Sequence, residues 1–151
     1  MDIPKFLELG EELETIASKL YEGLSGLTTD PAIGRQLKSL AAEELNHARI
    51  IRTGKTYCTE MPDLFIGLTL DDAEVLAVME EARSAHASLA PGDRLLERLK
   101  KMLEMERHFE RFHVAASIRI SEPSLHKLLA DMSKGDQSHM VVLKQLIEML
   151  S

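Results

Sequence analysis

The second part of this sequence repeats the first, with corresponding residues 92 positions apart and no gap. The correspondence joins Pro31 to Pro123, Glu14 to Glu106, Glu44 to Asp136, and His47 to His139. An internal repeat means that one supersecondary unit is used twice and that the two copies pack against each other. The repeat therefore restricts the chain to folds in which two similar halves face one another.

Each copy of the repeat reads as a pair of amphipathic helices. Apolar residues recur at i, i+3, i+4 and i+7 through residues 37–51, which is the period of a helix that faces a core. Asp30 and Pro31 supply a capping residue and a proline at the first helical position. They separate a helix over about 2–26 from a second helix, which we expect to end near Gly54. The second copy predicts helices over about 93–120 and 123–150, and short connections make both pairs antiparallel.

Residues 57–92 do not belong to the repeat and form a long connection between its copies. Asp71 and Asp72 cap a shorter helix in this span, and such a length returns the chain to its starting end. The apolar segment Leu64 to Leu70 suggests contact with a bundle end or with another subunit. The sequence thus predicts one all-α domain, an antiparallel four-helix bundle of two hairpins joined by a crossover with a short extra helix.

Composition narrows the possible classes of protein. Hydrophobic residues make up 44% of the chain but aromatic residues only 4%, which favours helix over sheet. A net charge of -7 argues against a nucleic-acid partner bound through its phosphates. Cys58 is the single cysteine, so no internal disulfide forms and a reducing cytosol fits. The acidic N-terminal segment is unlike a signal peptide, and no charge-free stretch is long enough to span a membrane. We expect a cytoplasmic protein with no membrane partner.

Polar side chains interrupt the apolar faces of all four long helices at one level. Glu44 and His47 lie on the inward face of residues 37–51. A carboxylate buried without a partner costs several kcal/mol or loses its charge, so a cation is needed there. In an antiparallel bundle the inward polar residues converge near the helix midpoints, and six ligands suit two metal ions. The candidate metal ligands are Glu14, Glu44, His47, Glu106, Asp136 and His139.

Other interpretations of these residues stay open. Glu44 and His47 can form a buried ion pair between adjacent turns. Glu14 and Glu106 can form salt bridges, although the nearest basic residues lie off the inward faces: Lys19, Arg107 and Arg111.

Two more inward side chains, Tyr21 and His113, correspond to each other in the repeat. The functional hypothesis for Tyr21 is a hydrogen bond to a ligand carboxylate, and the alternative is ordinary core. His113 can play the same part, act as an extra ligand, or belong to the core. Glu110 and His113 form a competing Glu-x-x-His motif, but Glu110 lies away from the inward face. We expect the remaining histidines to be solvated: His86, His108 and His126.

The two hairpins resemble the ferritin-like superfamily, and within it the rubrerythrin-like di-iron carboxylate proteins. That pattern is one Glu from each of two helices and a Glu-x-x-His from each of the other two. AAEELNHARI is similar to the second-helix motif, LEMERHFERFH to the third-helix motif, and Glu14 seven residues before Tyr21 to the first-helix motif. The resemblance implies a ferritin-like bundle holding two iron ions, with manganese or zinc as substitutes. It implies that Glu44 and Asp136 bridge the metals, that Glu14 and Glu106 are terminal ligands, and that His47 and His139 each bind one ion.

The fourth helix departs from the family pattern. It has Asp-Gln-Ser-His in place of Glu-x-x-His, and Asp136 follows Gly135 in mid-helix. Two readings are open: the half-site is looser or incomplete, or the helix bulges inward at Gly135 and brings the shorter side chain to the metal. We favour the bulge.

The resemblance implies a non-haem di-iron oxidoreductase that acts on hydrogen peroxide or dioxygen. Carboxylate and imidazole ligands without thiolate suit iron or manganese better than copper(I) or an iron–sulfur cluster. An external electron donor is implied because a rubredoxin domain is missing, and a homodimer is implied as well. Two alternatives remain: a ferroxidase for iron storage, which needs a cage, and a metal-free helical interaction module with a buried polar network.

Overall fold

The computed structural model describes residues 1–64 and 71–151, and every regular element in these ranges is helical. The elements are α1 (Ile3–Ser25), α2 (Pro31–Glu60), the short 3-10 helix η1 (Pro62–Leu64), α3 (Asp72–Ala87), α4 (Leu95–Arg119) and α5 (Pro123–Leu150). The predicted all-α class is confirmed. The suggestion that Leu64 to Leu70 covers a bundle end or a second subunit falls mainly on residues 65–70, which lie outside the described ranges.

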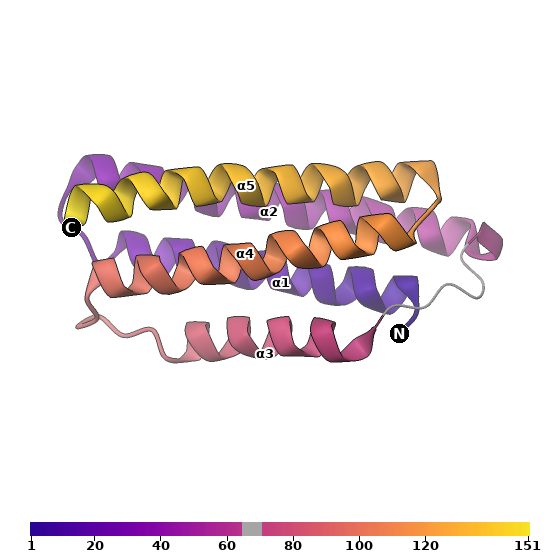
Figure 1. The fold of residues 1–151 in the computed structure, drawn as a ribbon, viewed down its shortest axis with the longest axis horizontal. Helices are drawn as coiled ribbons and strands as arrows, with labels where there is room; N and C mark the ends of the chain where they lie inside the picture. Colours follow the sequence, from indigo (N-terminus) through magenta and orange to yellow (C-terminus); the bar gives the residue numbers. More distant parts are fainter. Residues whose placement is uncertain (65–70) are drawn as a thin grey trace.

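The four long helices lie side by side, and α3 runs along the outer side of α1 and α4 (Figure 1). Contacts join α1 to α2, α2 to α5, α5 to α4, and α4 to α1, so the long helices enclose a common interior. Within each hairpin the helices are antiparallel (Figure 1). Helix α3 brings the chain back to the end where α2 began, as the length of the connection predicted.

The helix starts follow from local sequence. Four of the α-helices begin at an acidic residue whose carboxylate accepts a hydrogen bond from a backbone N–H of the first turn: Asp2, Asp30, Asp71 and Glu122. Such caps satisfy backbone groups that have no partner inside the helix. Pro31 and Pro123 occupy the first helical position, where no N–H is needed.

The predicted end of α2 near Gly54 was wrong, because the helix continues to Glu60. A Cβ atom on Gly54 would lie 3.0 Å from Leu128 Cδ1 and 3.5 Å from Leu125 Cδ2. This glycine therefore allows α5 to approach α2 closely and does not end the helix.

The interior is mostly aliphatic, and all five α-helices contribute side chains to it. Phe6 of α1 stacks on Phe112 of α4 with ring centroids 4.7 Å apart. The buried charged residues are confined to the middle of the four long helices, so the apolar layers on either side hold these helices in place around the polar ones. In the part of the chain that the structure describes, no helix combines the length and the apolar character needed to cross a membrane.

Candidate metal centre

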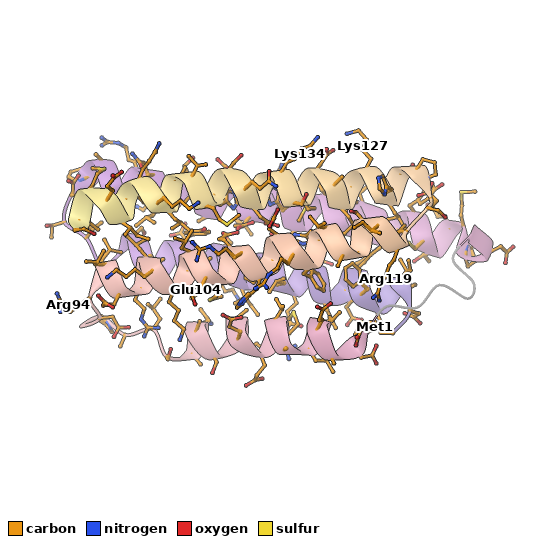
Figure 2. All side chains as sticks on the ribbon, in the orientation of Figure 1. Met1, Arg94, Glu104, Arg119, Lys127 and Lys134 are labelled. Atoms are coloured by element: carbon orange, nitrogen blue, oxygen red, sulfur yellow. The ribbon has the colours of Figure 1, made fainter. Side chains whose placement is uncertain are left out.

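The six predicted ligands all lie in the bundle interior. Only the His47 side chain reaches solvent, with 15% of its surface exposed. The other five have at most 1% of their surface exposed: Glu14, Glu44, Glu106, Asp136 and His139. On the same helix as Asp136 and His139, Lys127 and Lys134 project away from the bundle (Figure 2). The helical period thus places Lys127 and Lys134 on the solvated face of α5 and Asp136 and His139 on its buried face.

The first group of potential ligands joins α1 and α2. One oxygen or nitrogen atom from each of Glu14, Glu44 and His47 lies within 4.8 Å of the others, a spacing that a single metal ion can span. His47 Nδ1 is 3.1 Å from Glu44 Oε2 and 3.6 Å from Glu14 Oε2. The ion pair between adjacent turns that the sequence left open is therefore present, but it is part of a larger group.

The second group joins α2, α4 and α5. Glu44, Glu106 and His139 each bring one ligand atom within the same 4.8 Å limit. His139 Nδ1 is 3.0 Å from Glu44 Oε1 and 3.4 Å from Glu106 Oε1. Glu44 belongs to both groups, with Oε2 toward His47 and Oε1 toward His139. A carboxylate placed in this way can bridge two cations.

Tyr21 stands beside the second group. Its hydroxyl, fully buried, donates a hydrogen bond to Glu106 Oε1. The contact expected of this phenol is confirmed. It fixes one oxygen of Glu106 and leaves Oε2 free to bind something else.

Six buried polar atoms of the centre have no hydrogen-bond partner among the described residues. They are Glu14 Oε1, Glu44 Oε1, Glu106 Oε2, His113 Nε2, Asp136 Oδ1 and His139 Nδ1. Some of them approach each other without hydrogen-bond alignment, as His139 Nδ1 and Glu44 Oε1 do at 3.0 Å. Buried polar atoms are nearly always paired, and each unpaired one costs roughly 1–3 kcal/mol. Their convergence from four helices is the arrangement expected of ligands that face a cation.

Asp136 lies outside both groups of ligand atoms. Its Oδ2 is 2.6 Å from His113 Nδ1, and the other nitrogen of that ring, Nε2, is 3.4 Å from Glu14 Oε1. His113, with 1% of its surface exposed, therefore connects carboxylates of the two hairpins. The repeat pairs Glu44 with Asp136, but in the structure only Glu44 has the shared position.

The inward bulge expected at Gly135 was wrong, because α5 is a regular α-helix through residues 134–137. A Cβ atom on Gly135 would lie 2.6 Å from His47 Cε1 and 2.9 Å from His47 Nε2. The glycine thus makes room for the imidazole that crosses from α2.

We expect Gly135→Ala to weaken metal binding in the first group while changing apo-protein stability little. The new methyl group must push the His47 ring away from Glu14 and Glu44, which disrupts that group. Alanine gains about 1 kcal/mol of helix propensity, which offsets part of the strain. Zinc titration and thermal unfolding measure the two effects, with Gly92→Ala as the control because a Cβ there meets nothing within 4 Å. Equal zinc binding by Gly135→Ala and the parent would contradict this role of the glycine.

The electrostatics of the cation-free centre are those of facing carboxylates held in a low-dielectric interior. Burial raises the pKa of Glu14 to about 7, and the charge of Glu44 adds to the shift. Burial also raises the pKa of Glu106 and of Asp136. The interior thus makes it less favourable for each of these three carboxyl groups to be ionised.

Burial and the neighbouring carboxylates shift the pKa values of the histidines in opposite directions. Burial by itself lowers the pKa of His47, but hydrogen bonds with Glu14 and Glu44 raise it to about 10. For His139 the same opposition, now with Glu106 and Glu44, raises the pKa to about 12. For His113 burial again acts downward, and the charge of Asp136 raises the pKa to about 9.

The alternative salt bridges of Glu14 and Glu106 do not occur among the described residues. Both carboxylates face histidines, Tyr21 or another carboxylate, whereas Arg107 lies 3.8 Å from Glu104 on the surface. The competing Glu-x-x-His motif is also excluded, because Glu110 accepts a hydrogen bond from Gln137 outside the centre. His86 and His126 are exposed as expected, but His108 is only partly exposed and lies 2.6 Å from Glu81 Oε2.

Glu43 is a contact of the centre that the sequence reasoning missed. Its Oε2 lies 2.9 Å from His139 Nε2, while 53% of its side chain is exposed. Glu43 is off the inward face of α2, and the partner is on α5, so helical period alone gave no reason to select it. The available signal was chemical, since a histidine ligand commonly needs a carboxylate for its second nitrogen.

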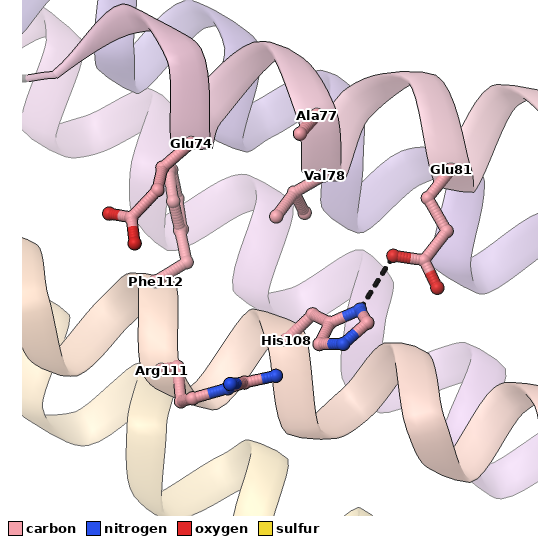
Figure 3. Close-up of a pocket in the computed structure, with 7 residues that line it drawn as sticks. All are labelled: Glu74, Ala77, Val78, Glu81, His108, Arg111 and Phe112. Carbon is pink, nitrogen blue, oxygen red and sulfur yellow. Dashed lines mark hydrogen bonds and ion pairs between the residues drawn. The ribbon is translucent and has the colours of Figure 1, made fainter.

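An open pocket of about 280 Å³ lies between α3 and α4 (Figure 3). It is lined by Glu74, Ala77, Val78, Glu81, His108, Arg111 and Phe112, and none of the candidate ligands lines it. The pocket is therefore separate from the candidate metal centre.

No family model matches this chain, and no curated protein or solved structure gives a significant match either. What the centre can do is therefore inferred from its own geometry.

Proposed function

We propose that this protein binds two transition-metal ions, iron by preference, between its four long helices and is a non-haem di-iron oxidoreductase. Hydrogen peroxide or dioxygen is the proposed oxidant. The observation that carries the metal assignment is the set of six buried atoms, contributed by all four long helices, that have no hydrogen-bond partner among the described residues. The choice of iron and of the oxidant rests on the resemblance of AAEELNHARI and LEMERHFERFH to rubrerythrin-like motifs.

Charge balance supports two divalent ions. Four carboxylates face the interior at this level: Glu14, Glu44, Glu106 and Asp136. Two divalent cations would neutralise their four negative charges. In the cation-free protein, protonated His47, His113 and His139 compensate part of this charge. Histidines that bind a metal are neutral, so two divalent ions would then supply the compensating charge. Oxygen and imidazole ligands fit iron, manganese or zinc and give no preference for copper(I).

The residues take distinct parts in this proposal. Glu14 and His47 would hold one ion and Glu106 and His139 the other, while Glu44, which belongs to both groups, would be shared between them. Tyr21 orients Glu106 through its hydroxyl. Two iron ions, when bound, would supply the two electrons that reduce a peroxide.

The enclosure of the centre selects the substrate by size. Its carboxylates are at most 1% exposed, so dioxygen or hydrogen peroxide can reach them through small fluctuations, whereas a larger organic substrate requires the helices to separate. The proposed cycle needs an external reductant, because the chain has a single thiol, Cys58, which is buried and forms no disulfide.

The first test is metal content after anaerobic loading with ferrous iron. We expect about two ions per chain, because two groups of ligand atoms share one bridging carboxylate. Hydrogen peroxide added to the loaded protein should oxidise the ferrous ions to ferric ions. About one peroxide molecule should be consumed per pair of ions. Retention of many more ions per chain after repeated aerobic additions would favour the iron-storage alternative instead.

A metal-free polar network is the competing assignment, and one contact favours it. The 2.6 Å distance between His113 and Asp136 shows that the centre can pair some of its charges internally. A protein with intact helical circular dichroism and no bound iron, manganese or zinc would decide for this alternative.

A further inference from the structure

His139 is the one predicted ligand whose two ring nitrogens both face carboxylates from other helices. Nδ1 is directed to Glu44 and Glu106 inside the bundle, and Nε2 is 2.9 Å from Oε2 of Glu43 at the surface. The ring itself is completely buried. It therefore spans the wall of the bundle from the interior to a solvated carboxylate.

A neutral imidazole carries one proton and one lone pair, so its two nitrogens cannot act alike. The nitrogen that binds a metal must be unprotonated, and the other then donates its N–H. A carboxylate on the outer nitrogen fixes this tautomer, holds the ring plane and makes the inner nitrogen a better donor to the metal.

We propose that Glu43 is a positioning residue for the metal centre, which accepts the Nε2 proton of His139 and presents Nδ1 to the second ion. The inference rests on the proposed function. Glu43 precedes Glu44 in α2, so one turn of helix supplies both the bridging carboxylate and the carboxylate that orients a histidine from the other hairpin.

The first half of the centre lacks this feature. His47 directs Nδ1 to Glu44 and Glu14, while its Nε2 lies against Gly135 and makes no hydrogen bond within the described residues. Removing the carboxylate of Glu43 should therefore affect one of the two ions and leave the other in place.

Zinc titration of Glu43→Ala, Glu43→Gln and Glu104→Ala tests this directly. Glu104 is an exposed carboxylate of α4 and serves as the matched control. We expect Glu43→Ala to weaken the second zinc ion by roughly 10–100-fold and to leave the first unchanged, the usual cost of losing such a partner. Glu43→Gln should recover most of the affinity, because its side-chain oxygen can still accept the N–H. Glu104→Ala should bind both ions like the parent.

Nitrogen-15 NMR of histidine-labelled, zinc-loaded protein distinguishes positioning from a general structural role. In the parent we expect His139 to show metal-bound Nδ1 and protonated Nε2, with slow exchange of the Nε2 proton. In Glu43→Ala that proton should exchange faster. Binding through Nε2 in the parent, or unchanged affinity and exchange in Glu43→Ala, would overturn the inference alone. A parent protein that binds no zinc, iron or manganese would overturn the proposed function as well.

Discussion

Glu44→Gln is expected to abolish binding of both metal ions, whereas His47→Ala should leave about one ion per chain, because Glu44 alone belongs to both groups of ligand atoms. The amide keeps the volume of the carboxylate, so the packing of α2 should survive. It removes one partner of His47 and His139 but leaves Glu14 and Glu106 facing them, so the cation-free protein should still fold, with lower stability than the parent. Metal analysis after anaerobic iron loading should give about two ions per chain for the parent, one for His47→Ala and none for Glu44→Gln.

The matched control for this series is Glu110→Gln. Glu110 also precedes a histidine by three residues, but its carboxylate bonds to Gln137 outside the centre. It should retain both ions. Loss of metal in Glu110→Gln, or two ions in Glu44→Gln, would show that the bridging position has been misassigned.

The helices could be predicted because their determinants are local. Period, acidic caps and the prolines at 31 and 123 are properties of neighbouring residues, and these starts were confirmed. Gly54 was misread because its role depends on Leu128 of another helix. A glycine in a helical pattern has the same sequence signature whether it ends the helix or admits a neighbour.

The same distinction explains what could be predicted about the centre. The inward positions of the carboxylates and histidines follow from helical period and were confirmed by burial. Their detailed partners depend on how the helices are rotated and shifted against each other. Neither the His113 to Asp136 contact nor the position of Glu43 beside His139 follows from a pattern along one helix.

The internal repeat was informative about position but not about role. It pairs Tyr21 with His113, and each of the two contacts a carboxylate of the opposite hairpin, Glu106 and Glu14 respectively. The phenol makes one such contact, whereas the imidazole has a second nitrogen and also holds Asp136. One substitution in the repeat therefore makes the two halves of the centre different.

The melting temperature of the cation-free protein should fall as the pH rises from 6 to 8. A histidine whose pKa is raised on folding stabilises the fold at low pH, and this stabilisation decreases once the pH passes its ordinary value of 6.5. His47 and His113, with pKa values of about 10 and 9, both contribute in this sense. Glu14, raised to about 7, stays protonated in the fold at pH values where the unfolded chain has lost the proton, so its effect has the same sign. Each extra proton bound by the folded state lowers the free energy of unfolding by about 1.4 kcal/mol per pH unit, which is roughly 3–6 °C in melting temperature for a domain of this size.

Zinc should reverse this trend, because metal ligands must be deprotonated and proton competition decreases as the pH rises. The difference in melting temperature between zinc-loaded and cation-free protein should therefore widen from pH 6 to pH 8. Glu44→Gln should flatten the pH dependence of the cation-free protein, since the charge of Glu44 contributes to the raised pKa of both His47 and Glu14. A cation-free parent that melts higher at pH 8 than at pH 6 would mean that its histidines are not held protonated by these carboxylates.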